Sequence, residues 1–221
     1  MPETVEVSIY KYNELPEKTQ AKVRDSWRIN GPGYDWWDSI YDDFGRICEI
    51  LGVELKTRPV RLMSGKTRDE PCVYFSGFWS QGDGASFEGT WRYKKGMARE
   101  IRSYAPEPWP GFSGVDKELH DIADQLADVA RRNFYRVCVR VAVRGPYCHS
   151  NTMCVEEIWR SDEGQWTETA EADVLQQLRR LADWLYKSLK AEYEYLTSDE
   201  AVAETIEANE YSFTSNGDIW P

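Results

Sequence analysis

Histidine, long apolar runs and paired cysteines are all scarce in this sequence of 221 residues. The two histidines, His120 and His149, leave few options for histidine-based acid–base or nucleophilic catalysis. No run of about 18 apolar residues occurs, so we expect no membrane-spanning helix. The five cysteines lack the spacing of a disulfide scaffold, and the first residues do not resemble a secretory signal. We therefore expect a protein of the reducing cytoplasm.

The motifs of the common enzyme classes are missing as well. The chain has no G-x-S-x-G, H-E-x-x-H, Walker or Rossmann pattern. We therefore predict a non-enzymatic protein, with no catalytic residue, no cofactor and no bound metal.

Basic residues run out toward the end of the chain. Residues 161–221 hold 14 acidic and 4 basic side chains, a balance of −10 in a protein of net charge −11, and no basic residue follows Lys190. Such a surface repels phosphates, so direct binding of DNA or RNA is not expected. It would instead attract a protein or nucleoprotein complex with a basic surface.

Aromatic residues are abundant, with 10 Trp, 13 Tyr and 7 Phe, and are sufficient to build a large core. Strand-like alternation occurs over residues 5–12, 53–63, 72–79, 85–93, 135–143 and 151–159, with a polar turn at 64–71. Helical spacing occurs over residues 13–29, 35–51, 94–104, 115–129, 170–196 and 197–209.

The order of these elements predicts the class of fold. Strands come in runs rather than alternating singly with helices, which favours an α+β fold with a largely antiparallel sheet. We expect about five to six strands packed against several amphipathic helices, in one domain over residues 1–221. Residues 105–114 are a possible internal linker because they are rich in Pro and Gly, and residues 161–221 form an acidic helical region.

The stretch "YFSGFWSQGDGASFEG", residues 74–89, is the most distinctive in the chain. Its Asp-Gly pair between two apolar runs predicts a β-hairpin with aromatic side chains on its inner face. A phosphate-binding loop would need a following helix and usually a Lys, and neither is present. Asp83 and Glu88 leave a second reading open, since paired carboxylates hold metals or perform acid–base chemistry.

Cysteine and histidine gather in one later segment, at Cys138, Cys148, His149 and Cys154. Their spacing matches no common zinc module, because no C-x2-C pair is present. On paired strands, Cys138 and Cys154 are expected to be small buried hydrophobic residues. Whether the four residues come together stays open at this stage.

The last predicted helix carries the main candidate site. Glu200, Glu204 and Glu207 repeat at i, i+4 and i+7 and so share one face, after a possible capping box at residues 197–200. One interpretation is a solvated face, and the other is a docking surface that imitates DNA phosphates. The candidate partner-binding residues are Glu192, Glu194, Asp199, Glu200, Glu204 and Glu207, with Trp79 and Asp83 of the hairpin.

Five segments of the chain resemble a family of phage and prophage proteins. They are "YKYNELPEKTQAKVRDSWR", "DWWDSIYDDFGRICEILGVEL", "VYFSGFWSQGDGASFEG", "NFYRVCVRV" and "YEYLTSDEAVAETIEANEYSF". Proteins of this family are often labelled as similar to an antitoxin of a toxin–antitoxin stability system. The resemblance provides no catalytic residues. The segment "RLMSGKTRDEPC", residues 61–72, departs from the family pattern and could be an insertion that makes a new contact.

Three functional hypotheses follow. The first is a phage or mobile-element protein that inhibits a host defence complex through its acidic surface, as an anti-CRISPR protein does. The second is an antitoxin that neutralises a partner toxin. The third is a metal-dependent enzyme that uses Asp83 and Glu88.

Overall fold

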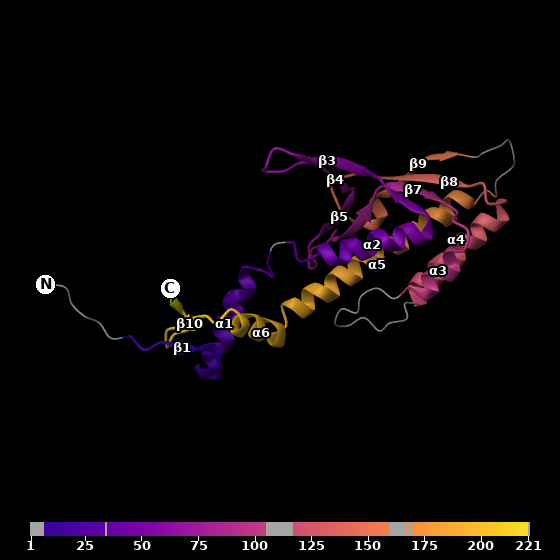
Figure 1. Cartoon of the computed structure of the whole chain (residues 1–221). Helices are drawn as coiled ribbons and strands as arrows, with labels where there is room; N and C mark the ends of the chain where they lie inside the picture. The colour runs from indigo at the N-terminus through magenta and orange to yellow at the C-terminus, as the bar shows by residue number, and fades with distance from the viewer. Residues whose placement is uncertain (1–6, 34, 105–116, 160–166, 168, 221) are drawn as a thin grey trace. The chain divides into compact units, whose positions relative to one another are not determined.

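The structure is a computed structural model that describes residues 7–33, 35–104, 117–159, 167 and 169–220. Its chain divides into two compact units, shown in Figure 1. Unit 1 joins Met1–Trp36 to Ala191–Pro221, and unit 2 is Trp37–Lys190. The sequence led us to expect one domain over residues 1–221. The possible linker at 105–114 lies outside the described residues.

Unit 2 is built on a four-stranded antiparallel sheet in the order β2-β7-β8-β9. The strands are β2 (Val53–Leu55), β7 (Gly89–Arg92), β8 (Cys138–Val143) and β9 (Met153–Trp159). Trp91, Val139 and Val141 are buried from alternate positions along β7 and β8, as strand geometry requires. The α+β fold and its antiparallel pairing are confirmed.

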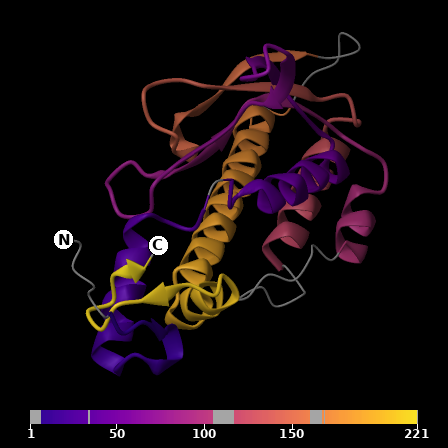
Figure 2. The same cartoon turned by 60° about the vertical axis from the view of Figure 1, so that its left-hand side comes forward.

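Helices lie along one side of this sheet (Figures 1 and 2). They are α2 (Asp38–Leu51), α3 (Met97–Ser103), α4 (Lys117–Arg132) and the part of α5 (Ala170–Leu196) that belongs to unit 2. The apolar spacing predicted α2, α4 and α5, and the predicted inward face of α5 is buried at Val174, Leu178, Leu181, Leu185 and Leu189. Gly52 ends α2 at φ 78°, where an added Cβ would lie 2.1 Å from the Arg92 carbonyl oxygen.

Two separate two-stranded ribbons complete unit 2. One pairs β3 (Thr57–Arg61) with β4 (Thr67–Pro71), and the other pairs β5 (Val73–Ser76) with β6 (Gly84–Phe87). The sequence predicted residues 64–71 as a polar turn, which is wrong for β4. The turn closes within five residues, since the Leu62 amide donates a hydrogen bond to the Lys66 carbonyl oxygen at 2.8 Å.

Two predicted strands are each broken in the structure. The strand predicted over 53–63 divides into β2, which joins the sheet, and β3, which joins a ribbon. The strand predicted over 85–93 divides at Glu88, because β6 pairs with β5 while β7 pairs with β2 and β8. In both cases the choice of partner strand decides the break, and the alternation of side chains does not reveal it.

Unit 1 brings together segments from both ends of the sequence. It holds η1 (Tyr12–Glu14), α1 (Glu17–Ile29), α6 (Asp199–Ala208), the last turns of α5, and a sheet of β1 (Tyr10–Lys11), β10 (Ser212–Phe213) and β11 (Ile219–Trp220). Its small core consists of Tyr12, Leu15, Val23, Val202, Ile206 and Phe213.

The predicted start of this unit needs correction. Within the described residues, the strand expected over 5–12 is limited to β1. Asn13 was expected to cap a helix but lies inside the 3₁₀ turn η1, and Pro16 is the N-cap residue of α1. Proline fits there because the missing N–H would have had no partner inside the helix.

Across the described residues, none of the helices has both the length and the apolar character needed to cross a membrane.

Candidate functional site

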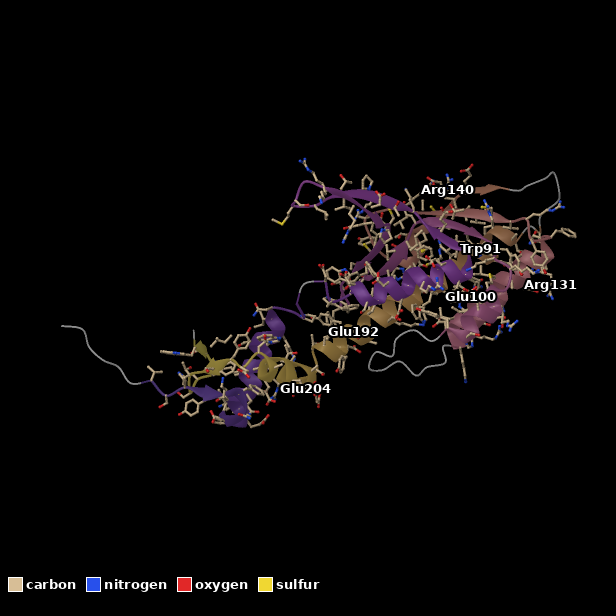
Figure 3. The ribbon with its side chains drawn as sticks, in the orientation of Figure 1. Trp91, Glu100, Arg131, Arg140, Glu192 and Glu204 are labelled. Atoms are coloured by element: carbon tan, nitrogen blue, oxygen red, sulfur yellow. The ribbon has the colours of Figure 1, made fainter. Side chains whose placement is uncertain are left out.

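Helix α6 presents the acidic face that its sequence spacing predicts. Ser198 caps the helix, and its side chain accepts a hydrogen bond from the Ala201 amide at 3.2 Å. Val202 and Ile206 are buried in the core of unit 1, which fixes the rotation of the helix. The opposite side therefore points to solvent, with Glu200, Glu204 and Glu207 all exposed (Glu204 is labelled in Figure 3).

The negative charge of the protein is concentrated in unit 1. Residues 1–36 and 191–221 contain 14 acidic and 5 basic side chains, a balance of −9. The 154 residues of unit 2 contain 24 acidic and 22 basic side chains, a balance of −2. The two units differ in the chemistry of their surfaces as well as in fold.

Arginines of α1 neutralise part of this charge. Arg28 donates to the Asp199 carboxylate, and Arg24 pairs with the same carboxylate at 3.4 Å. The hydrogen bond from Arg28 is the main cause that holds the pKa of Asp199 below its usual value. Glu17 and Asp25 also accept from these arginines, at 3.1 and 2.8 Å. Asp199 thus joins α6 to α1 and is not presented alone to a partner.

The three carboxylates on the α6 face lack such partners. The recorded ion pairs of unit 1 involve Glu17, Asp25, Asp199 and Asp218, and within the described part of the chain none involves Glu200, Glu204 or Glu207. Their charge is therefore available to a partner molecule.

The two candidate carboxylates at the end of α5 differ in environment. Glu194 is exposed, whereas Glu192 is half-buried. The Glu192 Oε2 atom is buried, without a hydrogen-bond partner among the described residues, and burial raises the pKa of this carboxyl. Burial therefore disfavours the charged form of Glu192, and this residue contributes little to the surface charge.

In unit 2, Asp83 organises the loop between β5 and β6. Its Oδ2 atom accepts hydrogen bonds from the Trp79 and Ser80 amides, at 3.0 and 2.6 Å. Gly77 is needed beside it, since an added Cβ would lie 2.9 Å from the same oxygen. Trp79 is held at the outside of this loop with 73% of its surface exposed, edge-on to Phe78. Asp83 is a loop-forming residue, and Trp79 is the exposed apolar contact that the loop offers.

Glu88 is not close to Asp83. The two residues flank the four-residue strand β6, so about 16 Å of extended chain separates them. Glu88 instead pairs with Lys56 at 2.5 Å. Among the described residues, no three His, Cys, Asp or Glu side chains gather in a way that could hold a metal ion.

Cys138 and Cys154 also lie apart. Cys138 stands opposite Trp159 in the ladder of β8 and β9, and Cys154 stands opposite Ala142, so the two thiols occupy different ends of the strand pair. His149 Nδ1 accepts from the Asn151 amide at 3.1 Å and caps a 3₁₀ turn. All five cysteines are free thiols. Among the described residues, these side chains do not gather into a zinc site.

A shallow hollow beside α5 was not foreseen from the sequence. Its volume is about 330 Å³, and Ser150, Asn151, Arg179 and Asp183 are among its lining residues. Arg179 donates to the carbonyl oxygens of Met153 and Asn151, at 2.6 and 3.3 Å. Arg180 also lines the hollow and pairs with Asp121 at 2.7 Å. Because both guanidinium groups already have partners, the hollow offers little to an anionic ligand.

Together these features define an α+β protein with a mixed-charge scaffold and one acidic unit that presents an unpaired carboxylate face. The chain belongs to a family described as a domain of unknown function, DUF8835, which matches residues 36–199. The matched range nearly coincides with unit 2, so most of α6 and all of α1 lie outside it. No curated protein and no solved structure matches the chain.

Proposed function

We propose that this is a non-enzymatic phage or mobile-element protein that binds and inhibits a host defence complex through the acidic surface of unit 1, in the manner of an anti-CRISPR protein. The observation that carries the proposal is the exposed, unpaired face of α6 formed by Glu200, Glu204 and Glu207. The resemblance to phage and prophage proteins supports the choice of a host target.

The spacing of the three carboxylates supports imitation of a nucleic acid. They extend along the helix axis over about 10 Å, at 1.5 Å per residue. That length corresponds to about three nucleotide steps of one B-DNA strand, at 3.4 Å per step. A basic channel that holds a nucleic acid backbone would therefore meet three fixed negative charges over a length of about 10 Å.

The electrostatics favour binding over a purely solvated role. Like charges at i and i+4 cost a helix about 0.2–0.5 kcal/mol per pair when no cation compensates them. A partner that supplies Lys or Arg converts this repulsion into attraction and speeds encounter by steering.

The test compares two sets of charge-neutral variants. Tagged protein should capture a basic nucleic-acid-handling complex from a host lysate, and capture should weaken as salt rises. The variant Glu200→Gln, Glu204→Gln and Glu207→Gln should lose at least tenfold in affinity, because it removes the charged face and keeps the helix-forming side chains.

The matched control removes three exposed charges from unit 2. Asp42→Asn, Glu54→Gln and Glu156→Gln change the net charge by the same amount away from α6. Equal losses of affinity in the two sets of variants would mean that the net charge of the protein, and not the α6 face, determines binding. An α6 variant that still inhibits the captured complex as strongly as the wild-type protein would contradict the proposal.

A partner toxin is the second candidate, supported by the antitoxin label of the resembling family. The same acidic face would then bind a basic toxin. A neighbouring gene whose product is lethal without this protein would favour it. The metal-dependent enzyme has less support, since Asp83 and Glu88 each have a structural partner of their own.

A further inference from the structure

The ribbon of β3 and β4, residues 57–71 and called the arm below, has an unusual position in unit 2. Five residue pairs form its ladder, from Thr57 opposite Pro71 to Arg61 opposite Thr67, and no third strand joins it among the described residues. All its side chains are exposed except those of Val60 and Glu70, which are half-buried. Figure 1 shows the arm reaching out beyond the four-stranded sheet of unit 2.

The arm does not contribute to the hydrophobic core. A two-stranded hairpin is at best marginally stable in water by itself, and none of the arm residues is fully buried. Its edges are also protected from pairing with another strand. Pro59 has no N–H to donate, and charged side chains line both strands. The arm must therefore act through its side chains.

The charge of the arm is opposite to that of the whole protein. Residues 57–71 contain 4 basic and 2 acidic side chains, a balance of +2, in a chain of −11. Glu70 pairs with Arg68 at 2.7 Å, and the Arg58 guanidinium lies 5.6 Å from the centre of the Tyr74 ring. Arg61 and Lys66 stand on either side of the turn and take part in no ion pair with a described residue.

The tip of the arm is apolar. Leu62 is 37% exposed, and Met63 is fully exposed two residues before Gly65, which adopts φ 79° to close the turn. This exposed Leu-Met pair lies between two unpaired cations, an arrangement that fits a partner that is anionic outside and apolar within. Duplex DNA has both properties, with phosphates at the groove edges and base surfaces, including thymine methyl groups, on the groove floor.

We infer that the arm enters the major groove of duplex DNA, with Arg61 and Lys66 on phosphates and Leu62 and Met63 against the base edges. A groove about 12 Å wide and 8.5 Å deep admits a two-stranded ribbon. The strands of the arm, at about 17 Å, are longer than that depth. The major groove of A-form RNA is too narrow for the same fit.

This inference revises the expectation, drawn from net charge, that the protein makes no direct contact with nucleic acid. The screening length is about 10 Å at 0.1 M salt, so a potential is set by nearby charges more than by the total. The arm and α6 belong to different units and use different residues, so either proposal can fail alone.

The experiment measures binding of the full chain to a fluorescent 20-base-pair DNA duplex between 50 and 200 mM salt. The wild-type protein should bind with micromolar affinity. The variant Arg61→Gln with Lys66→Gln should bind at least tenfold more weakly. The slope of log affinity against log salt should fall by about 2, since two phosphate contacts are lost.

A control variant has the same loss of charge elsewhere in unit 2. Lys95→Gln with Arg99→Gln removes two exposed cations near the start of α3 and should change the affinity less than twofold. A third variant, Leu62→Ser with Met63→Ser, should weaken binding and leave the salt slope unchanged. Thermal unfolding of each variant checks that unit 2 remains folded.

Three results would overturn the inference. The first is a duplex that stays unbound at 100 µM protein and 50 mM salt. The second is an equal loss of affinity in the arm variant and the control variant. The third is a change of molar mass in the arm variant without DNA, measured by light scattering, which would assign the arm to contact between two copies of this chain.

Discussion

Trp91 connects the sheet of unit 2 to the end of α2. It is fully buried, and its Nε1–H donates to the Leu51 carbonyl at 3.0 Å. Trp91→Phe should lower the free energy of unfolding by about 1–3 kcal/mol, because it leaves a buried carbonyl without that partner. Trp91→Ala should cost about 3–5 kcal/mol, because it also leaves a cavity.

Urea titration measures both losses. The exposed Trp79 is the control, and Trp79→Ala should cost less than about 1 kcal/mol. A loss for Trp91→Phe no larger than that of the control would mean that the indole hydrogen bond does not contribute to stability.

Glu192 makes stability depend on pH. Burial raises its pKa in the folded protein above the unfolded value, so the folded state binds the proton more tightly. Its contribution therefore becomes less favourable as pH rises from about 4, the ordinary Glu pKa, through the raised value. Glu192→Gln should match the wild type below pH 4 and be more stable than the wild type at pH 7, because the amide carries no charge that burial would penalise.

Thermal unfolding at pH 4 and pH 7 checks this expectation. The wild-type protein, unfolded in parallel at both pH values, supplies the reference for each comparison. A stability gap for Glu192→Gln that is the same at both pH values would contradict the assignment.

At the scale of the element, two neighbouring residues, Thr197 and Ser198, are candidates for the N-cap of α6. The sequence favoured a capping box that starts at Thr197, but the Thr197 hydroxyl donates to the Tyr193 carbonyl at 2.7 Å and closes α5. Ser198 is the cap. Ser198→Ala should therefore destabilise unit 1 by about 1 kcal/mol.

Hydrogen exchange of the α6 amides provides the measurement. Ser198→Asp retains a capping oxygen and should restore the protection that Ser198→Ala loses. If Thr197→Ala reduces protection of the first turn of α6 more than Ser198→Ala does, the capping box is correct instead.

The elements also show how far the sequence could predict this fold. Long α5 was predicted with its observed bounds, because a stripe of Val and Leu at three- and four-residue spacing has few other interpretations. The arm was missed at β4 because Thr67, Asp69 and Pro71 alternate with residues that are no more apolar. A ribbon exposed on both faces has no hydrophobic period.

The candidate site could be predicted in part for a related reason. The i, i+4, i+7 spacing of the glutamates is sufficient to identify the exposed face of α6, because residues at that spacing share one side of a helix. The capture of Asp199 by Arg24 and Arg28 could not be foreseen, since those residues are about 170 positions away in the sequence. Asp83 and Glu88 were grouped by proximity in sequence, yet a strand separates them.

At the scale of the whole molecule, the two units should be separable by one core substitution. Val23 is buried in unit 1, so Val23→Asp places a charge in that core and should unfold unit 1. Capture of a basic partner should then be lost although every α6 carboxylate is still present. Binding of the DNA duplex by the arm should persist, because unit 2 keeps its own core.

Hydrogen exchange followed by mass spectrometry reports on both units in one sample. Protection should disappear from α6 and β10 and remain in β8. Lys18→Asp changes an exposed side chain of the same helix and should leave all three protected. Loss of protection throughout the chain would show that the units unfold together.

The pairing of Tyr10 with Phe213 also determines when unit 1 can fold during synthesis of the chain. Unit 1 cannot close until a segment about 200 residues downstream has left the ribosome, whereas all of unit 2 is synthesised before that segment. At about 5–20 residues per second, α1 waits about 10–35 s for its packing partners. During that interval Leu15 and Val23 lack their packing partners, so we expect the nascent α1 to be recognised by chaperones that bind short apolar segments.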